Sequence, residues 1–477
     1  MSRTQLLKQI FNVHSVAIIG ASRRMGHPGH LALMGLKEFG FDGKIYPINP
    51  SAREIDGIKA YPNIKAVHEP VDLAFIAVPA AKVTPILRDC AEKGVKGVII
   101  NSAGFKELGT KEGIEREEEV RRIASSTGMG IIGPNCVGFH RSSISTMPGL
   151  PQSAEIKAIL KEKGPVGMTS QSGWFCGFYV HNCALRGVRF STVISSGNEA
   201  DFTTIDFLEY LGEDEDTKVI TMYLEGVKDG KSFLKVCKAI TPKKPVIVWK
   251  VGLTKAGSRA AFSHTGSLAG QEGIYGAVFR QAHIVQAFSS KELIDFTVGF
   301  SLCRQPKGNR VGIISSPGGF AVATADACER FGLNVPRLSE KTIKALKKVL
   351  PQYSSTLNPI DLTMTAIENP QFYPECMEIL NSDDKIDSII VVTGASVVYD
   401  EFIVESVREI EKPVMVVLTP YGIVETGPSA LAKAGIPTYT YPEEAAKSLA
   451  SLTQYALSSH RVTGFYPRYK PLRVSEC

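Results

Sequence analysis

The chain has 477 residues, 44% of them hydrophobic and 21% charged, which predicts a soluble globular protein of about three domains and excludes a disordered or fibrous chain. Its formal net charge of +6 comes from scattered basic residues, which argues against nucleic-acid binding but suits an anionic ligand. Without a membrane-length apolar run, and with 9 cysteines spread singly and no CxxC pair, we expect reduced thiols in a cytoplasm, no membrane segment, no disulfide framework and no metal site.

Residues 1–148 alternate short apolar runs with helical stretches and are predicted to form the first domain. The alternation predicts a Rossmann-like α/β domain with a parallel sheet. Its expected strands are 15–20, 44–50, 73–79, 97–101 and 129–133. The first strand leads into a glycine-containing loop at 20–30 and then a helix at 31–39. This order is typical of folds that cradle a phosphate at a helix N-terminus.

The glycine loop predicts a phosphate-bearing ligand, and the residues around it bear on which one. The glycine spacing differs from the G-x-G-x-x-G pattern, and the second strand ends in Asn49-Pro50 without an acidic residue for a ribose hydroxyl. Both features speak against a nicotinamide dinucleotide. Arg23 and Arg24 in the loop, with Lys44 beside the second strand, favour a more highly phosphorylated nucleotide, and NADP is an alternative on that evidence.

Two further loops, at 101–107 and 133–138, follow the fourth and fifth predicted strands. Ordinary turn chemistry explains either loop alone, because both are rich in glycine, proline, asparagine and serine. The carboxyl ends of parallel strands meet at one edge of a sheet, which is where such folds bind ligands. The loops together therefore predict a ligand site at that edge.

Residues 149–306 are predicted to form a second, flavodoxin-like domain with a parallel sheet. Its first strand ends in Ser170-Gln171-Ser172-Gly173, and a helix is expected over 174–186. The serine hydroxyls and the free N–H groups of that helix start predict an anion site, which the helix dipole supports. Simple capping of the helix by Ser170 or Ser172 is a compatible alternative.

A glycine- and serine-rich loop at 257–270 carries His264 in its middle, with Gly266 close behind. Small flanking residues let a backbone approach a phosphate closely, and histidine is a nucleophile and an acid–base group near neutral pH. The alternative is a turn whose histidine only bonds locally. Glu225 ends an apolar strand and can meet His264, where a carboxylate would fix the imidazole tautomer, although a surface salt bridge is the alternative for Glu225.

Residues 307–477 are predicted to form a second flavodoxin-like domain and a distant internal repeat of the preceding one. Another strand, Ser/Gly loop and helix follow one another over 309–331. This half has no counterpart of His264, and Pro317 stands where the preceding domain has Gln171 and Ser172. Packing and subunit contact are the default interpretation, and a second phosphate site at 315–319 stays open.

Five short motifs of the first domain occur in the order found in a known family. They are Gly20-Ala21-Ser22, Pro47-Ile48-Asn49-Pro50, Ala77-Val78-Pro79, Ser102-Ala103-Gly104-Phe105 and Gly133-Pro134-Asn135-Cys136. They resemble the CoA-binding domain of the nucleoside-diphosphate-forming acyl-CoA synthetases, whose superfamily includes succinyl-CoA synthetase alpha subunits. The resemblance implies that the first glycine loop carries the CoA phosphates and that the Ser102 and Cys136 loops lie near the thiol. The residues assigned to CoA are Gly20, Ala21, Ser22, Arg23, Lys44, Asn49, Pro50, Val78, Pro79, Asn101, Ser102, Ala103, Gly104, Asn135 and Cys136.

The second domain carries motifs that resemble the ligase domain of the same family. They are Ser170-Gln171-Ser172-Gly173, Ser196-Gly197-Asn198, Tyr223-Leu224-Glu225-Gly226 and Ser263-His264-Thr265-Gly266-Ser267. The resemblance implies that His264 is phosphorylated and that Glu225 steadies it. It also implies that phosphate is held by Ser170, Gln171, Ser172, Gly173 and Gly266.

The resemblance implies a reversible reaction that converts acyl-CoA, ADP and phosphate into a free carboxylic acid, CoA and ATP through an acyl phosphate and a phosphohistidine. The chain shows neither a Walker A sequence nor a segment that resembles an ATP-grasp module. A separate ATP-grasp beta subunit is therefore expected to bring ADP, ATP and Mg²⁺ in a hetero-oligomer, expected as alpha2beta2. The alternatives are a non-catalytic CoA-binding regulatory protein and an NADP-dependent oxidoreductase. The carboxylic acid and the choice between ADP and GDP stay open.

Overall fold

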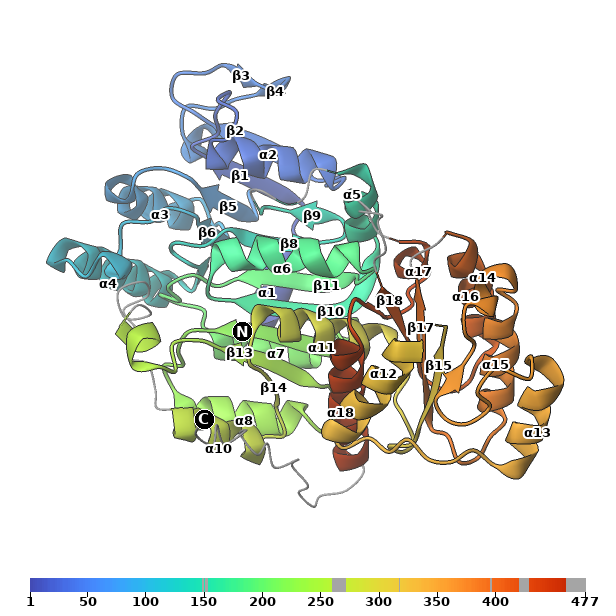
Figure 1. Ribbon diagram of the computed structural model, residues 1–477. Coiled ribbons are helices and arrows are strands. Elements are labelled where there is room, and N and C mark those ends of the chain that lie inside the picture. Colours follow the sequence, from blue (N-terminus) through green and yellow to red (C-terminus); the bar gives the residue numbers. More distant parts are fainter. Residues whose placement is uncertain are drawn as a thin grey trace. The chain divides into compact units, whose positions relative to one another are not determined.

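The computed structural model describes residues 1–147, 150, 153–259, 272–316, 318–394, 397–419 and 429–459. The chain divides into two compact units, one of Met1–Ala184 with Val188–Leu293 and the other of Leu185–Gly187 with Ile294–Cys477. Both are layered α/β structures in which helices cover mainly parallel sheets (Figure 1), as the sequence predicts. No helix among the described residues is long and apolar enough to cross a membrane.

The first sheet has five parallel strands in the order β2-β1-β5-β6-β7. The strands are β1 Ser15–Ile19, β2 Lys44–Ile48, β5 Leu73–Ile76, β6 Gly97–Ile100 and β7 Gly130–Ile132. The helices of this part are α1 Arg3–Phe11, α2 Pro28–Glu38, α3 Val83–Glu92 and α4 Lys111–Thr127, and a short hairpin is formed by β3 Glu54–Ile55 and β4 Ile58–Lys59. Winding reverses between β1 and β5, and such a reversal leaves a crevice at the carboxyl ends of the two strands.

The second sheet, in the same unit, has the order β14-β13-β12-β10-β11-β8-β9. Its parallel strands are β10 Lys163–Ser170, β11 Phe190–Ser195, β12 Val219–Leu224, β13 Val246–Lys250 and β14 Val285–Ala287. Two antiparallel strands, β8 Gly138–Arg141 and β9 Ile144–Ser145, extend its edge. The helices are α5 Ala154–Lys161, α6 Gly173–Leu185, α7 Thr204–Glu213, α8 Gly230–Ile240 and α10 Glu272–Gln281, and α11 Ser290–Leu302 begins here but belongs to the other unit from Ile294 on. The chain thus joins the second sheet before residue 148, and the predicted domain boundaries stay predictions.

The third sheet, in the other unit, has five parallel strands in the order β16-β15-β17-β18-β19. They are β15 Val311–Ser315, β16 Ile360–Asp361, β17 Ser388–Gly394, β18 Val414–Thr419 and β19 Thr438–Tyr439. The helices are α12 Gly318–Arg330, α13 Glu340–Val349, α14 Thr365–Glu368, α15 Phe372–Asn381, α16 Val397–Glu409, α17 Ala430–Lys433 and α18 Pro442–Ser459. The parallel strands of all three sheets follow one pattern. In each sheet the first parallel strand in the chain lies between the second and the third, and the fourth and fifth follow beyond the third.

The second and third sheets also agree in detail. In each sheet a lysine before the fourth parallel strand donates to two backbone carbonyls at the end of the helix that precedes the third strand. Lys244 donates to Leu211 and Asp214 at the end of α7, and Lys412 donates to Leu380 and Asp383 at the end of the third sheet's corresponding helix, α15. Both lysines lie in a Lys-Pro-Val sequence that begins the strand. Agreement in winding and in side-chain contacts supports the internal repeat that the sequence predicts.

Candidate functional site

The glycine loop of the first sheet lies at the reversal between β1 and β5. Gly20 has φ +89°, and a Cβ there would lie 2.3 Å from the carbonyl oxygen of Ala77, so only glycine fits. A Cβ at Gly29 would lie 2.2 Å from the carbonyl oxygen of Gly20, which puts the first turn of α2 directly against the loop. Pro28 and the His27 cap define where α2 begins. The loop therefore presents a close backbone approach next to a helix N-terminus, as a phosphate site needs.

Two predicted ligand residues hold this loop in shape. The Asn49 side chain donates to the carbonyl of Ala21 over 2.8 Å and accepts the N–H groups of Ser51 and Ala52, so it ties the end of β2 to the loop. The Arg23 guanidinium donates to the carbonyl of Glu54 on β3 at 2.7 and 3.0 Å. Both side chains thus position the loop backbone.

Lys44 is the predicted residue that the structure does not bring to this edge. It is the first residue of β2, whereas the loops follow the last residues of their strands. Five residues of extended chain span roughly 13 Å between their end Cα atoms. Because strand direction places Lys44 at the opposite edge of the sheet, we remove it from the candidate site.

The remaining loops of the first sheet are joined by hydrogen bonds. Ser102 donates through its hydroxyl to the carbonyl of Val78, and Asn101 donates through its amide to the carbonyl of Cys136 over 2.8 Å. The backbone N–H of Asn135 donates to the carbonyl of Ser102 over 3.0 Å. The structure therefore brings these predicted residues together, with the neighbouring Pro79 and Ala103 exposed beside them.

Cys136 is a buried structural thiol. It is 2% exposed, its Sγ donates to the carbonyl of Ile100 over 3.4 Å, and burial raises its pKa to about 12. A thiol in that state is neutral and a poor nucleophile at neutral pH. Cys136 therefore shapes its loop and takes no part as an attacking group.

The ligand edge of the first sheet abuts the second sheet within the same unit. A Cβ at Gly197 would lie 2.2 Å from the carbonyl oxygen of Pro134, and the N–H of Asn198 donates to that same carbonyl over 2.9 Å. The Asn135 side chain donates to Asn198 over 3.3 Å, and the N–H of Val137 donates to Ser195 Oγ over 3.2 Å. The Asn135 loop thus meets the end of β11, which is the strand next to β10, and the predicted anion loop Ser170–Gly173 follows β10.

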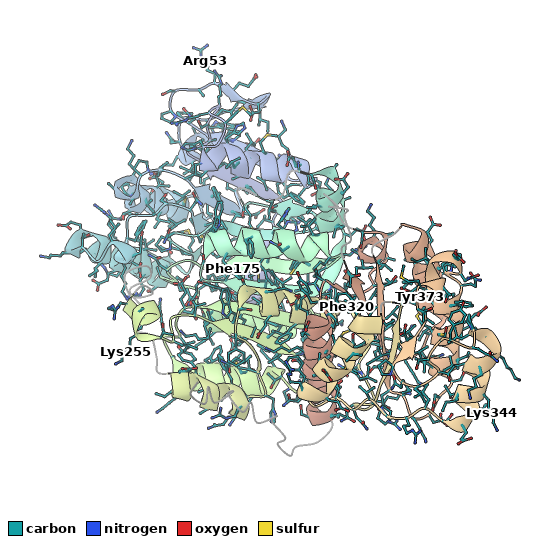
Figure 2. The ribbon with its side chains drawn as sticks, in the orientation of Figure 1. Arg53, Phe175, Lys255, Phe320, Lys344 and Tyr373 are labelled. Atoms are coloured by element: carbon teal, nitrogen blue, oxygen red, sulfur yellow. The ribbon has the colours of Figure 1, made fainter. Side chains whose placement is uncertain are left out.

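The anion loop joins β10 to α6 at the reversal of the second sheet, and Figure 1 shows α6 crossing one face of that sheet. Ser172 Oγ accepts the N–H of Phe175 over 3.4 Å, which is the capping contact that the sequence suggests. Ser170 Oγ donates to the carbonyl of Ser172 over 2.8 Å. Phe175, labelled in Figure 2, stacks on Tyr223 of β12 with 4.5 Å between ring centroids and so fixes the first turn of the helix. The N–H groups of that turn carry the positive end of the helix dipole.

Gln171 joins the anion loop to the end of β12. Its Oε1 accepts the N–H groups of Glu225 over 2.6 Å and Gly226 over 3.0 Å, and its Nε2 donates to the carbonyl of Gly226 over 2.9 Å and to Glu199 over 3.0 Å. The amide is thus committed to the protein. Gln171 therefore holds the two loops together and is placed beside the anion site rather than free within it.

Glu225 is a carboxylate at the end of β12 with only 4% of its surface exposed. Burial, followed by the charge of Glu225 and a hydrogen bond to it, raises the pKa of Tyr223. Lys250 at the end of β13 is also 4% exposed and donates to the carbonyl of Glu225 over 2.8 Å. The predicted carboxylate is therefore buried and fixed, and the surface salt bridge is excluded for it.

The predicted histidine and its glycine fall on a part of the chain that the structure does not describe. His264 and Gly266 lie between Arg259 and α10, outside the described residues. The structure describes the chain from Val251 to Arg259 before them and from the start of α10 after them. The pairing of His264 with Glu225 therefore stays a prediction.

Sequence reasoning assigned no role to three carboxylates next to the site, of which Glu117 and Glu199 are buried and Glu107 is partly exposed. Asn198 donates through its amide to Glu107 and, over 2.9 Å, to Glu117. Glu199 accepts from Ser196 over 2.9 Å and from Thr204 over 2.6 Å. The pKa of Glu107 is lowered overall. Burial raises it, but hydrogen bonds from the backbone of Gly104, the side chain of Asn198 and the backbone of Phe105 outweigh burial. Only Glu107 had a sequence signal, its place in a ligand-edge loop. The other two have none, because helix and strand-end acids are normally exposed.

Three family models match the chain in succession. They are a CoA binding domain at 14–142, a succinyl-CoA ligase like flavodoxin domain at 163–300 and a ligase-CoA domain at 311–463. The three matched segments contain the first, second and third sheets, respectively, apart from strands β8 and β9.

Curated relatives cover nearly the whole chain. It is 39% identical to the acetate–CoA ligase (ADP-forming) II subunit alpha of Pyrococcus furiosus, over 94% of this chain and 98% of that protein. It is 38% identical to the acetate–CoA ligase (ADP-forming) of Methanocaldococcus jannaschii and 35% identical to the 4-hydroxybutyrate–CoA ligase (ADP-forming) of Nitrosopumilus maritimus. The chain spans only 63% and 64% of the length of those two relatives.

Solved structures agree with these relatives. The chain superposes with a TM-score of 0.84 and 33% identity on a structure from Ca. Korarchaeum cryptofilum, the dinucleotide forming acetyl-coenzyme A synthetase 1 in complex with phosphate and ADP. The similarity covers 95% of this chain and 97% of the other. The apo form of the same protein gives a TM-score of 0.83.

Proposed function

The chain belongs to the family of ADP-forming acyl-CoA synthetase alpha subunits, and we propose from this that it converts acyl-CoA, ADP and phosphate into a carboxylic acid, CoA and ATP with a partner subunit. The family membership rests on nearly full-length similarity to two alpha subunits and on three consecutive family models. The proposal concerns the reaction of this chain, its intermediates and the residues that carry them.

CoA binds across the carboxyl edge of the first sheet in this proposal. The close-approach glycine loop at Gly20 and the start of α2 take its phosphates. The thioester end then reaches the loops of Ser102 and Asn135, which are joined to each other by a hydrogen bond. Contacts between the Asn135 loop and the end of β11 in the second sheet support this orientation, because they bring the thioester end towards the second sheet.

Phosphate held at the start of α6 is then next to the thioester. One of its oxygens attacks the thioester carbonyl, the carbon–sulfur bond breaks, and CoA leaves as the thiolate while an acyl phosphate forms. The first-turn N–H groups of α6 stabilise the anionic charge throughout the step. Val137 packs where a Cβ on Gly173 would come within 2.9 Å, so the two sites are in direct van der Waals contact.

His264 takes the phosphoryl group from the acyl phosphate in the next step. An imidazole nitrogen attacks phosphorus, the bond to the carboxylate oxygen breaks, and the free acid leaves as its anion. The β-phosphate oxygen of ADP later attacks the same phosphorus and releases the histidine. The buried Glu225 carboxylate holds the other ring nitrogen as its acceptor, which fixes the tautomer and stabilises the phosphorylated ring.

A separate partner supplies the nucleotide half of the reaction. The chain spans 98% of two relatives that are alpha subunits, but 63% to 67% of several single-chain relatives, so about a third of those longer proteins has no counterpart here. We propose that this third is an ATP-grasp beta subunit that binds ADP, ATP and Mg²⁺ in a cytoplasmic alpha2beta2 assembly. A small carboxylic acid is the remaining substrate.

The observation that carries the proposal is the junction of the two sheets at Asn135, Ser195 and Gly173. It joins the loops at the carboxyl edge of the first sheet to the start of α6 within one compact unit, which supports a reaction between CoA-bound and phosphate-bound groups. Neither a CoA sensor nor an oxidoreductase requires a phosphate site at that place.

Radiolabelled phosphate tests the proposal. The chain and its co-purified partner are incubated with a panel of acyl-CoAs, magnesium and labelled phosphate. We expect a label on this chain that is acid-labile and base-stable, as phosphohistidine is, and that disappears in His264→Ala. A wild-type chain that binds CoA but takes no label from any acyl-CoA or from ATP would contradict the enzyme and leave a CoA-binding regulator. A spectral change with NADPH would instead indicate the oxidoreductase.

A further inference from the structure

We propose that Lys250 is a positioning residue for phosphoryl transfer. It holds the backbone of Glu225 in a fixed position relative to the described residues on either side of the His264 segment. The inference deepens the proposed function and rests on it. The lysine lies at the end of β13, where one strand of the second sheet leaves the core. Its ammonium group makes contacts with three separate parts of the chain.

The first contacts are backbone hydrogen bonds. Lys250 Nζ donates to the carbonyl of Glu225 over 2.8 Å and also to the carbonyl of Val251. The opposite side of the Glu225 residue is held by Gln171, whose Oε1 accepts the Glu225 N–H over 2.6 Å. Both polar backbone groups of Glu225 therefore have a side-chain partner, one from the anion loop and one from Lys250. This double attachment fixes the backbone from which the carboxylate extends, and the carboxylate itself has a side-chain hydrogen bond with Tyr223.

The second contact is with the helix that follows the His264 segment. Lys250 Nζ lies 4.6 Å from the ring centroid of Tyr275 on α10, a cation–π distance. A backbone hydrogen bond from Val227 reaches the Tyr275 hydroxyl, so the same ring is also attached to the end of β12. Lys250 thus contacts the chain just before the His264 segment, at Val251, and just after it, at Tyr275. One ammonium group joins both flanks to Glu225.

A lysine is an expensive choice at such a place. Burial lowers the pKa of Lys250 to about 8, against the opposing charge of Glu225. A buried ammonium loses its hydration, and an apolar side chain of similar length would avoid that loss.

The third sheet provides an internal control, because the strand pairing allows a residue-by-residue alignment of the third sheet with the second sheet. Ile220 pairs with Val246 in one sheet, as Ile389 pairs with Val414 in the other. In this register Lys250 corresponds to Leu418 and Glu225 to Gly394. Tyr223 corresponds to Val392, since the first strands pair Ser170 with Tyr223 and Ser315 with Val392.

A different pair of lysines shows which contacts both sheets share. Lys244 and Lys412, at the other ends of the same two strands, keep the same double carbonyl contact in both sheets. Lys250, Glu225 and Tyr223 are instead exchanged together for uncharged residues in the sheet whose fourth strand leads to no histidine loop. Lys250 therefore belongs to the glutamate and its chemistry and is not required by the sheet.

The experiment measures the rate at which acyl-CoA and phosphate label the chain, in the complex with its co-purified partner. The variants are Lys250→Met, which keeps the length and removes the charge, and Lys250→Arg, which keeps the charge. Lys244→Met is the matched control, a lysine of the same strand with the same kind of contact at the opposite end. CoA affinity, measured by calorimetry, reports whether the first sheet and its edge are intact.

We expect Lys250→Met to label at least about tenfold more slowly, the usual loss for a residue that orients a reacting ligand. CoA affinity should stay within about twofold, and Lys250→Arg should recover most of the rate, because the ammonium acts on Glu225 and not on CoA. Lys244→Met should label at the wild-type rate. Among the described residues, the titratable groups in contact with Lys250 are Glu225, directly after β12, and Tyr275 of α10. The wild-type rate should fall as pH rises through about 8, and Lys250→Met should lack that fall.

Labelling of Lys250→Met at the wild-type rate, or equal slowing in Lys250→Met and Lys244→Met, would overturn the inference and leave the proposed function intact. Absence of label from the wild-type complex would overturn both. Should Lys250→Met not fold, Lys250→Gln replaces it. Should neither variant fold, Lys250→Arg decides, because its guanidinium stays charged above pH 8. A fall in its labelling rate above pH 8 equal to that of the wild type would assign the fall to another group and overturn the inference.

Discussion

The second and third sheets begin alike, with a first strand that ends in serine and a helix that starts at glycine, yet their edges carry different charges. In the second sheet Ser170 pairs with Ser195, and in the third Ser315 pairs with Asp361. A Cβ on Gly318 would lie 2.7 Å from Asp361 Oδ2, so this carboxylate stands at the start of α12. A neutral hydroxyl stands at the corresponding place beside α6. The start of α12 thus already has an anion from its own chain.

This difference shows that the fold alone does not decide whether a helix start at the reversal can take an external anion. Both sheets have the same winding and the same helix position, so both offer a helix N-terminus at the reversal. The side chains at a few strand ends decide whether an external phosphate can use it. A second phosphate site at 315–319, which the sequence left open, is disfavoured by the Asp361 charge next to Gly318.

Replacing Glu225 by glutamine removes the main feature that separates the two sheets and should have the largest effect. The amide keeps the size of the side chain but loses the charge that, in the proposed reaction, fixes and stabilises the imidazole of His264. We expect histidine labelling to slow by about a thousandfold, or about 4 kcal/mol of transition-state free energy. Rapid-quench measurement of the label checks this.

The control for this prediction lies in the third sheet. Asp361→Asn removes a carboxylate at a strand end of the repeat, and it should leave the labelling rate unchanged. Equal slowing by Glu225→Gln and Asp361→Asn would show that the two edges act as one site and would break the comparison.

The second sheet alone has the extra strands β8 and β9, and they carry an acid-sensitive group. His140 of β8 is fully buried, and burial lowers its pKa from 6.5 to about 4. As pH falls, the unfolded chain takes up the proton first, so stability is complete above pH 6.5 and is lost between pH 6.5 and about 4. The loss amounts to about 3 kcal/mol.

Tryptophan fluorescence measures this loss selectively. Both tryptophans of the chain, Trp174 and Trp249, belong to α6 and β13 of the second sheet. His140→Leu should abolish the acid-dependent part of their unfolding, and His181→Leu, on α6, should not. Acid sensitivity that persists in His140→Leu would assign it to other groups.

Much of this architecture could be predicted because it follows local patterns. Apolar runs and the glycine or serine loops after them indicated the parallel strands, and the order of the motifs indicated the edge where the loops meet. Gly20 and the Ser170–Gly173 loop lie where these patterns place them. Glu225 was predicted for a similar reason, since a carboxylate directly after an apolar strand stands out.

Other features depend on contacts between distant parts of the chain, which no local pattern records. Lys44 belongs to β2, whose last residue leads to the candidate site, but it is the first residue of that strand and therefore lies at the opposite edge of the sheet. Its position in the sequence alone did not show at which end of the strand it lies. The role of Lys250 depends on the register between β12 and β13. Glu117 is buried on a highly charged helix because Asn198, 81 residues away, donates to it.

The two lysines that both sheets share should have equal, purely structural effects. Lys244→Met and Lys412→Met each remove one donor from two backbone carbonyls. Both sites are partly exposed and the carbonyls of Asp214, Leu380 and Asp383 still accept a backbone N–H, so the loss is compensated in part. We expect each variant to lower the free energy of unfolding of its own unit by about 1.5 kcal/mol. Hydrogen exchange resolved by peptide assigns the loss to a unit. Loss of labelling in Lys244→Met with normal stability would contradict the structural role.

Asp361→Asn should have the smallest effect and tests the comparison from the third sheet. The variant keeps the side-chain oxygen that accepts the N–H of Thr363 over 2.8 Å, and it loses only the favourable interaction of the charge with the start of α12. We expect a loss of about 0.5 kcal/mol in the stability of the second unit, measured by the same exchange experiment. Added phosphate should protect α6 in the wild-type chain and should not protect α12. If phosphate protects α12 only in Asp361→Asn, then that single carboxylate separates the two edges. If it protects α12 equally in the wild-type chain, the third sheet binds phosphate after all, and the charge of Asp361 does not distinguish it from the second.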